Sequence, residues 1–108
     1  YYHWDNLKPE DFRYFQDYTS YLEVDMSQYL QEEDRAFIDA YSMCYPKEDR
    51  ARIMEYACLP GNEDYFRSET MQNKLRTLCE GIRKTFGLEK YQDALLWEQY
   101  LNEPLMTK

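Results

Sequence analysis

The segment AYSMCYPKEDRARIMEY, residues 40–56, contains the residue types and spacing that could do chemistry. Tyr41 stands seven residues before Glu48, and Pro46 shortly precedes the acidic pair Glu48 and Asp49. Proline suits the first position of a helix because its fixed φ matches helical backbone and its missing N–H would be unpaired there. The two acids then lie in the first turn, at the positive end of the helix dipole. A helix start of this kind accounts for the acids but not for Tyr41.

This segment resembles the second active-site segment of gluzincin-type zinc metallopeptidases, in particular bacterial metallopeptidases related to lethal-factor-type peptidases. In that family an upstream HExxH helix supplies two histidine ligands and the general-base glutamate, and a downstream helix supplies a third, glutamate ligand. The resemblance implies that Glu48 is the third zinc ligand and that Tyr41 is the catalytic hydroxyl. Such a hydroxyl would stabilise the oxyanion or protonate the leaving amine. Ala51 matches the small residue three positions after the ligand.

A second stretch supports the resemblance, and two departures limit it. A W-x-x-L-x-P-x-x-F-x-Y pattern resembles the segment that follows the HExxH helix, and it consists of Trp4, Leu7, Pro9, Phe12 and Tyr14. Arg52 stands where the family often has a glutamate that supports the site from outside. HExxH does not occur in these 108 residues, and His3 is the one histidine. A lone histidine near a terminus is more often solvated than a ligand.

These features set the expected cofactor and partners. Zinc is expected in the complete parent protein and no cofactor in this chain alone. The expected partners are a peptide substrate or the missing HExxH half, and a protein partner is an alternative. The chain starts with Tyr-Tyr-His-Trp and without an initiator methionine, so it looks like an excised piece. A secreted or lipid-anchored parent protein fits the resemblance.

Composition narrows the classes of partner. The formal net charge is −8, which argues against nucleic acid because phosphate recognition needs a basic surface. The acidity lies in the first part of the chain, where residues 1–66 hold 15 acids and 6 bases. Two interpretations stay open, an ordinary solvated surface or a cation-attracting region around Glu48. No membrane span is expected, because the chain has no run of about 18 apolar residues.

The three cysteines form neither a disulfide framework nor a zinc-finger pattern. Cys44, Cys58 and Cys79 are odd in number and lack CxxC spacing. Cys58 and Cys79 fall on expected apolar helix faces, so we expect them to act as small buried hydrophobic residues.

The expected fold is mainly α, a single small helical domain over residues 1–108 with an irregular, aromatic-rich N-terminal part. The clearest helix follows the N-cap Ser68, has Lys84 in its last turn and stops at Gly87. Its apolar stripe, at spacings of three and four, consists of Met71, Leu75, Leu78, Cys79, Ile82 and Phe86. Residues 60–62 predict a turn, and residues 88–101 predict a further helix. Alternation over residues 22–26 predicts a strand, and a short β-hairpin is one arrangement that would pair it.

Three hypotheses follow from the sequence. The chain is the C-terminal subdomain of a zinc peptidase, and as an isolated chain it is inactive. Alternatively, it is a metal-free descendant that serves as a protein-interaction module, for which its tyrosines would give rigid amphipathic contact area. The third hypothesis is a structural helical domain without a site. The sequence upstream of Tyr1 would separate the first hypothesis from the other two.

Overall fold

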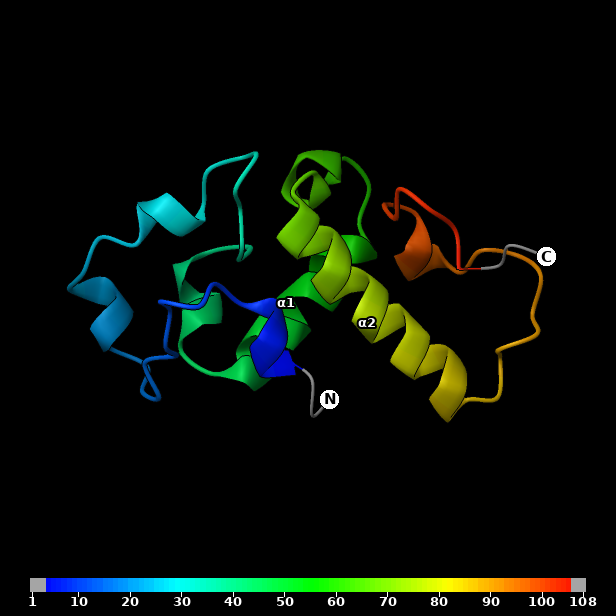
Figure 1. Cartoon of the computed structure of the whole chain (residues 1–108), viewed down its shortest axis with the longest axis horizontal. Coiled ribbons are helices and arrows are strands. Elements are labelled where there is room, and N and C mark those ends of the chain that lie inside the picture. The colour runs from blue at the N-terminus through cyan, green and yellow to red at the C-terminus, as the bar shows by residue number, and fades with distance from the viewer. Residues whose placement is uncertain (1–3, 106–108) are drawn as a thin grey trace.

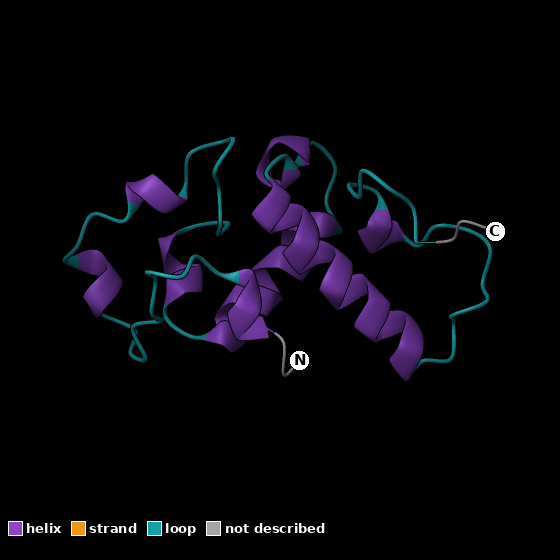
Figure 2. Cartoon of the chain, in the orientation of Figure 1, coloured by secondary structure: helices purple, strands orange, loops and turns teal. Residues whose placement is uncertain are grey.

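Two α-helices form the centre of the computed structural model, which describes residues 4–105 (Figure 1). Helix α1 spans Pro46–Ala57 and helix α2 spans Glu69–Thr85. Short 3₁₀ helices and loops make up the rest of this range (Figure 2). The fold is therefore mainly helical with an irregular N-terminal part, as the sequence predicted. His3 lies outside the described residues.

Helix α1 starts where the sequence predicted, and helix α2 both starts and stops there. Pro46 is the first residue of α1. The Ser68 hydroxyl caps α2 by accepting a hydrogen bond from the Met71 N–H at 3.1 Å. Gly87 follows the end of α2 with a φ of 69°, a left-handed conformation that favours glycine. Gly61, in the predicted turn between the helices, has a φ of 79°.

The predicted β-hairpin is wrong, because no strand occurs in the described range. Leu22 ends one 3₁₀ helix, and residues 23–26 connect it to the next one. The two 3₁₀ helices are Ser20–Leu22 and Ser27–Tyr29. An aspartate stands before each one. The Asp17 carboxylate accepts a hydrogen bond from the Ser20 N–H at 2.8 Å, and the Asp25 carboxylate accepts one from the Ser27 N–H at 3.0 Å. These side-chain bonds offer the backbone an alternative to strand pairing.

Two groups of buried side chains hold the molecule together. The larger lies between α1, α2 and the N- and C-terminal segments, and it contains Trp4, Ile38, Ile53, Ala57, Phe66, Met71, Leu75, Leu78 and Cys79. The smaller lies under the irregular front part and contains Phe12, Tyr29, Ala36, Phe37 and Met43. Most of the predicted stripe of α2 is thus core. Two residues of the stripe are not core, because Ile82 is only half-buried and Phe86 is 71% exposed.

The predicted helix over residues 88–101 is wrong, since this segment is irregular apart from the 3₁₀ helix Leu96–Glu98. Arg83 of α2 gives the physical reason. Its guanidinium donates hydrogen bonds to the backbone carbonyls of Leu88, Tyr91 and Asp93 at 2.8–3.0 Å. It also forms a buried ion pair with Glu98, with 2.6 Å between Nε and Oε2. A side chain therefore binds carbonyl groups that a helix would have used internally.

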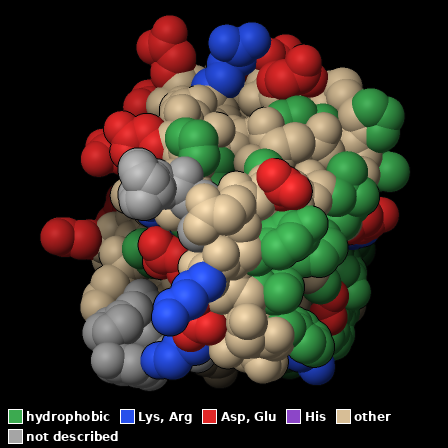
Figure 3. Space-filling model, turned by 90° about the vertical axis from the view of Figure 1, so that its right-hand side faces the viewer, with side chains coloured by type: hydrophobic (Ala, Val, Ile, Leu, Met, Phe, Trp, Pro, Cys, Tyr) green, Lys and Arg blue, Asp and Glu red, His purple; other side chains and the backbone are tan. Residues whose placement is uncertain are grey.

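One end of the molecule carries exposed apolar side chains. Figure 3 views the end where α2 stops, and hydrophobic side chains gather on part of this face. The exposed apolar residues of this part of the chain are Phe86, Tyr91 and Leu96. Neither helix within residues 4–105 is both long enough and apolar enough to cross a membrane, in line with the prediction.

Candidate functional site

Tyr41 lies in the short 3₁₀ helix Ala40–Met43, which is held from two sides. Asp39 caps this helix, since its Oδ1 accepts hydrogen bonds from the Ser42 N–H at 3.0 Å and from the Ser42 hydroxyl at 2.9 Å. Arg52 of α1 forms an ion pair with Asp39 at 3.3 Å, and its guanidinium carbon lies 4.9 Å from the centre of the Tyr41 ring. Arg52 thus fixes the Tyr41 loop against α1.

Glu48 lies in the first turn of α1 and is half-buried. Its Oε2 accepts a hydrogen bond from the Tyr18 hydroxyl at 2.8 Å. Within the described range, its Oε1 accepts no hydrogen bond and no basic side chain pairs with it. The carboxylate is therefore oriented but not neutralised, which leaves one oxygen for a further ligand.

Tyr18 connects the two predicted site residues. While its hydroxyl binds Glu48, its ring stacks on the Tyr41 ring with 5.8 Å between ring centres and 28° between the planes. Tyr45 lies against Tyr18 at 5.0 Å, and Tyr21 meets Tyr41 edge-on at 5.8 Å. The structure thus brings Tyr41 and Glu48 to one tyrosine-rich surface. Sequence reasoning missed Tyr18, because nothing in its neighbourhood distinguishes it from the other eleven tyrosines.

The surroundings of Tyr18 and Tyr41 raise the pKa of both hydroxyls. The hydrogen bond to Glu48 raises the pKa of Tyr18 to about 12. Partial burial and the negative charge of Glu48 raise the pKa of Tyr41 above its usual value of about 10. The Tyr41 hydroxyl donates to no group within residues 4–105, so it is a free hydrogen-bond donor beside Glu48.

Asp49, the neighbour of Glu48, has a different environment. Its side chain and that of Lys74 on α2 are both 0% exposed, and Lys74 Nζ lies 2.7 Å from Asp49 Oδ2. The Tyr14 hydroxyl donates to the same oxygen at 2.7 Å, and the Trp4 indole N–H donates to the Tyr14 oxygen at 3.0 Å. Lys74 also donates to the backbone carbonyl of Ala36 at 2.5 Å. This buried network ties the start of α1 to α2 and to the N-terminal segment.

Burial has opposite effects on the two charges of this pair. It raises the pKa of Asp49 and lowers the pKa of Lys74, while the charge of each partner opposes the shift of the other. Asp49 lies in the first turn of α1, as predicted, but it is buried against Lys74. Trp4 and Tyr14, two residues of the W-x-x-L-x-P-x-x-F-x-Y stretch, belong to the same network.

Metal-ligand groups are sparse in the described part of the chain. No cluster of three or more His, Cys, Asp or Glu side chains there could hold a metal ion. A carboxylate oxygen is a common zinc ligand, so Glu48 fits the role of one ligand, but a catalytic zinc needs three protein ligands. Two ligands would have to come from other residues. The three cysteines are free, with Cys44 and Cys79 buried and Cys58 half-buried at the end of α1.

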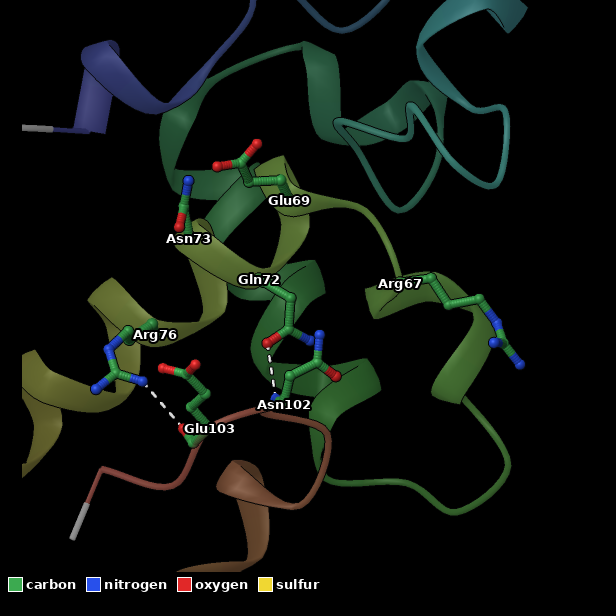
Figure 4. A pocket seen from close by; sticks show the side chains of 7 residues that line it. All are labelled: Arg67, Glu69, Gln72, Asn73, Arg76, Asn102 and Glu103. Atoms are coloured by element: carbon green, nitrogen blue, oxygen red, sulfur yellow. Dashed lines mark hydrogen bonds between the residues drawn. The ribbon is translucent and has the colours of Figure 1, made fainter. Parts of the chain in front are cut away.

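The groove between α2 and the C-terminal segment is a weaker candidate (Figure 4). It encloses about 340 Å³ and is lined by polar residues of mixed charge. Its groups already bind one another. Gln72 accepts a hydrogen bond from the Asn102 N–H at 2.9 Å, and Arg76 donates to the Glu103 carbonyl at 3.0 Å. These bonds join the C-terminal segment to α2, so we regard the groove as a structural contact.

The surface around Tyr18, Tyr41 and Glu48 is thus the candidate site. No protein-family model, curated protein or solved structure matches the chain.

Proposed function

We propose that this chain is the C-terminal portion of a gluzincin-like zinc metallopeptidase, in which Glu48 is the third zinc ligand and Tyr41 the catalytic tyrosine. One observation carries the proposal. Glu48 is a half-buried carboxylate at a helix start that no basic residue of the described range neutralises, and it lies beside a tyrosine with a free hydroxyl. The family resemblance of residues 40–56 assigned roles to these same two residues.

The chemistry that these residues would perform follows from their surroundings. A bound zinc ion would polarise the scissile carbonyl and activate a water molecule. Glu48 would hold the ion through Oε1, because its Oε2 already accepts the Tyr18 hydrogen bond. The Tyr41 hydroxyl would donate a hydrogen bond to the carbonyl oxygen as negative charge develops there. The isolated chain would be inactive, since its described residues offer one of the three ligands.

The test uses the complete gene product, including the residues that precede Tyr1. We expect that segment to contain HExxH and the protein to bind one zinc ion. Glu48→Ala should lower zinc affinity and peptidase rate together. Tyr41→Phe should keep zinc content and melting temperature while the rate falls by about two to three orders of magnitude, the scale for one lost oxyanion donor. An upstream sequence without HExxH, or wild-type zinc affinity in Glu48→Ala, would refute the proposal.

A second candidate function is a metal-free protein-interaction module. Exposed apolar side chains on the acidic front segment favour it, with Leu22 at 70% and Val24 at 49% exposure. Scattered exposed apolar residues are ordinary, so this observation is less specific than the environment of Glu48. A parent protein without zinc and without peptidase activity, but with a partner that Leu22→Asp releases, would favour the second candidate.

A further inference from the structure

The segment of residues 17–25 carries exposed apolar side chains that take no part in the core. Leu22 is 70% exposed and Val24 is 49% exposed. Neither belongs to the two groups of buried side chains or to the side chains that pack against those groups. In Figure 1 this segment lies at the end of the molecule opposite the loop that follows α2. The two side chains are therefore available for contact with another molecule.

Short-range hydrogen bonds fix the backbone of the 17–25 segment. The Leu22 N–H donates to the Thr19 carbonyl at 3.0 Å. The Glu23 N–H donates to the Ser20 carbonyl, also at 3.0 Å. A surface that is already held in shape loses less conformational entropy when a partner binds. The exposed apolar side chains are thus presented on an ordered backbone.

The surroundings of these apolar side chains are acidic. Residues 14–34 contain six acids and no lysine or arginine. Glu23 stands between Leu22 and Val24 in the sequence, and Asp25 follows directly, and both acids are exposed. Within the described range, neither of these two carboxylates forms an ion pair. The segment therefore combines exposed apolar area with negative charge that no basic side chain neutralises.

Charge decides which class of partner suits this segment. The formal net charge of −8 repels nucleic acid and anionic lipid surfaces. A second copy of the chain would offer the exposed apolar end around Phe86. The exposed charged residues near that end are mixed in sign, namely Glu80, Lys84, Glu89, Lys90 and Asp93. That end is therefore not complementary in charge to the 17–25 segment, and the partner has to be a different, basic chain.

We propose that the 17–25 segment is a docking surface for a basic, amphipathic segment of another protein. Apolar side chains of the partner cover Leu22 and Val24, and its lysine or arginine side chains pair with Glu23 and Asp25. Burial of the apolar side chains supplies affinity, and the complementary charges supply specificity and speed of association. This inference rests on the second candidate function, to which it gives a partner, and it needs no metal ion.

The test measures binding of three labelled peptides of equal length to the 108-residue chain by fluorescence anisotropy. The first peptide has leucines on one helix face and lysines on the other. The second has glutamate in place of every lysine, and the third has serine in place of every leucine. Leu22→Ser and Glu23→Lys change the proposed surface. Phe86→Ser and Glu89→Lys are the matched controls, because they make the same kinds of change at exposed positions of the opposite end.

We expect the lysine–leucine peptide to bind, and the other two peptides to bind at least about 10-fold more weakly. Leu22→Ser should weaken binding of the lysine–leucine peptide about 10-fold, because it removes a leucine that the partner would bury. Glu23→Lys should weaken it about 5-fold at low salt and less at about 0.3 M salt, because salt screens exposed charges. Both controls should bind as the wild type does. All four variants should keep the wild-type melting temperature, since each changes an exposed side chain.

Four results would overturn the inference. The first is equal binding of the lysine–leucine and glutamate–leucine peptides, and the second is a loss in Phe86→Ser as large as that in Leu22→Ser. The third is a lowered melting temperature of Leu22→Ser, which would assign Leu22 to the fold. The fourth is a dimer in sedimentation velocity that Leu22→Ser dissociates, which would make a second copy the partner.

The inference and the second candidate function can fail separately. If the lysine–leucine peptide does not bind, but Leu22→Asp releases a partner of the parent protein, the basic partner is overturned and the interaction module stands. If neither happens, both are overturned. The zinc proposal is untouched by either result, because the zinc affinity of Glu48→Ala decides it.

Discussion

The buried pair of Asp49 and Lys74 predicts a strong energetic coupling between α1 and α2. Both side chains are 0% exposed, and the charged atoms are 2.7 Å apart. At an effective dielectric constant of about 20, their attraction is roughly 6 kcal/mol, and moving each ion out of water costs several kcal/mol in return. The attraction and the desolvation cost therefore nearly cancel, and the complete pair contributes little net free energy to folding. Removal of one partner leaves a buried charge without compensation, which costs about 3–5 kcal/mol.

Three variants test this reasoning by urea denaturation of the 108-residue chain. Lys74→Met keeps an unbranched side chain that is one heavy atom shorter and removes the charge, and Asp49→Asn removes the opposite charge. Each should lose about 3–5 kcal/mol, a large part of the stability of a small domain. The double variant should lose less than the sum of the two by at least about 1 kcal/mol. Lys84→Met is the control, since Lys84 is an exposed lysine on the same helix and should change stability by about 0.5 kcal/mol or less.

The pH dependence gives a second readout of the same pair. Burial raises the pKa of Asp49 in the folded chain, and the charge of Lys74 counteracts that rise. Without Lys74 the pKa of Asp49 rises further. A carboxyl group with a raised folded pKa favours the fold at low pH and loses that contribution as the pH rises through the folded pKa. The deficit of Lys74→Met relative to the wild type should therefore be smaller at pH 4 than at pH 8. The coupling would be refuted if the losses in unfolding free energy of the two single variants simply added in the double variant. It would also be refuted if Lys74→Met lost as little stability as Lys84→Met.

Two further predictions concern the core and the C-terminal segment. Leu75→Ala should cost about 2–5 kcal/mol in urea unfolding because Leu75 is fully buried, whereas Phe86→Ala should change stability by about 0.5 kcal/mol or less because Phe86 is 71% exposed; equal costs would contradict this core assignment. Burial of Glu98 opposes its ionisation, but hydrogen bonds from Arg83 and from the Leu95 N–H outweigh burial and lower its pKa. The ionised form of Glu98 therefore stabilises the fold above its unfolded pKa of about 4.3, and this contribution is lost as the pH falls through the folded pKa. Between pH 7 and pH 3 the melting temperature of the wild type should fall further than that of Glu98→Gln, and parallel pH profiles would show that the ion pair is not linked to acid unfolding.

The sequence by itself determined the two α-helices. Pro46 starts α1, Ser68 caps α2 and Gly87 ends it, and each acts within one or two turns of its own position. The apolar stripe of α2 could also be predicted from the sequence, because residues three and four apart share one helix face. Local signals of this kind need no knowledge of what lies across the core.

Only the tertiary structure decided the C-terminal segment and the buried charges. Residues 88–101 have a helical pattern, but Arg83 binds three backbone carbonyls there, which no local pattern encodes. Lys74 and Arg83 both lie on α2 and are not part of its predicted apolar stripe. Each is buried because a carboxylate distant in sequence meets it, Asp49 in one case and Glu98 in the other.

The candidate site was also predicted in part from the sequence and decided in part by the tertiary structure. Spacing and resemblance singled out Tyr41 and Glu48 from the sequence, but the helix-start pattern alone did not distinguish Glu48 from Asp49. Successive residues of a helix point about 100° apart, so one carboxylate faces α2 and the other faces Tyr18. Tyr18 belongs to the site because the turn at Gln16 places its hydroxyl next to Glu48, which lies 30 residues further along the chain. Such contacts depend on the path of the backbone, and the types of the residues do not reveal them.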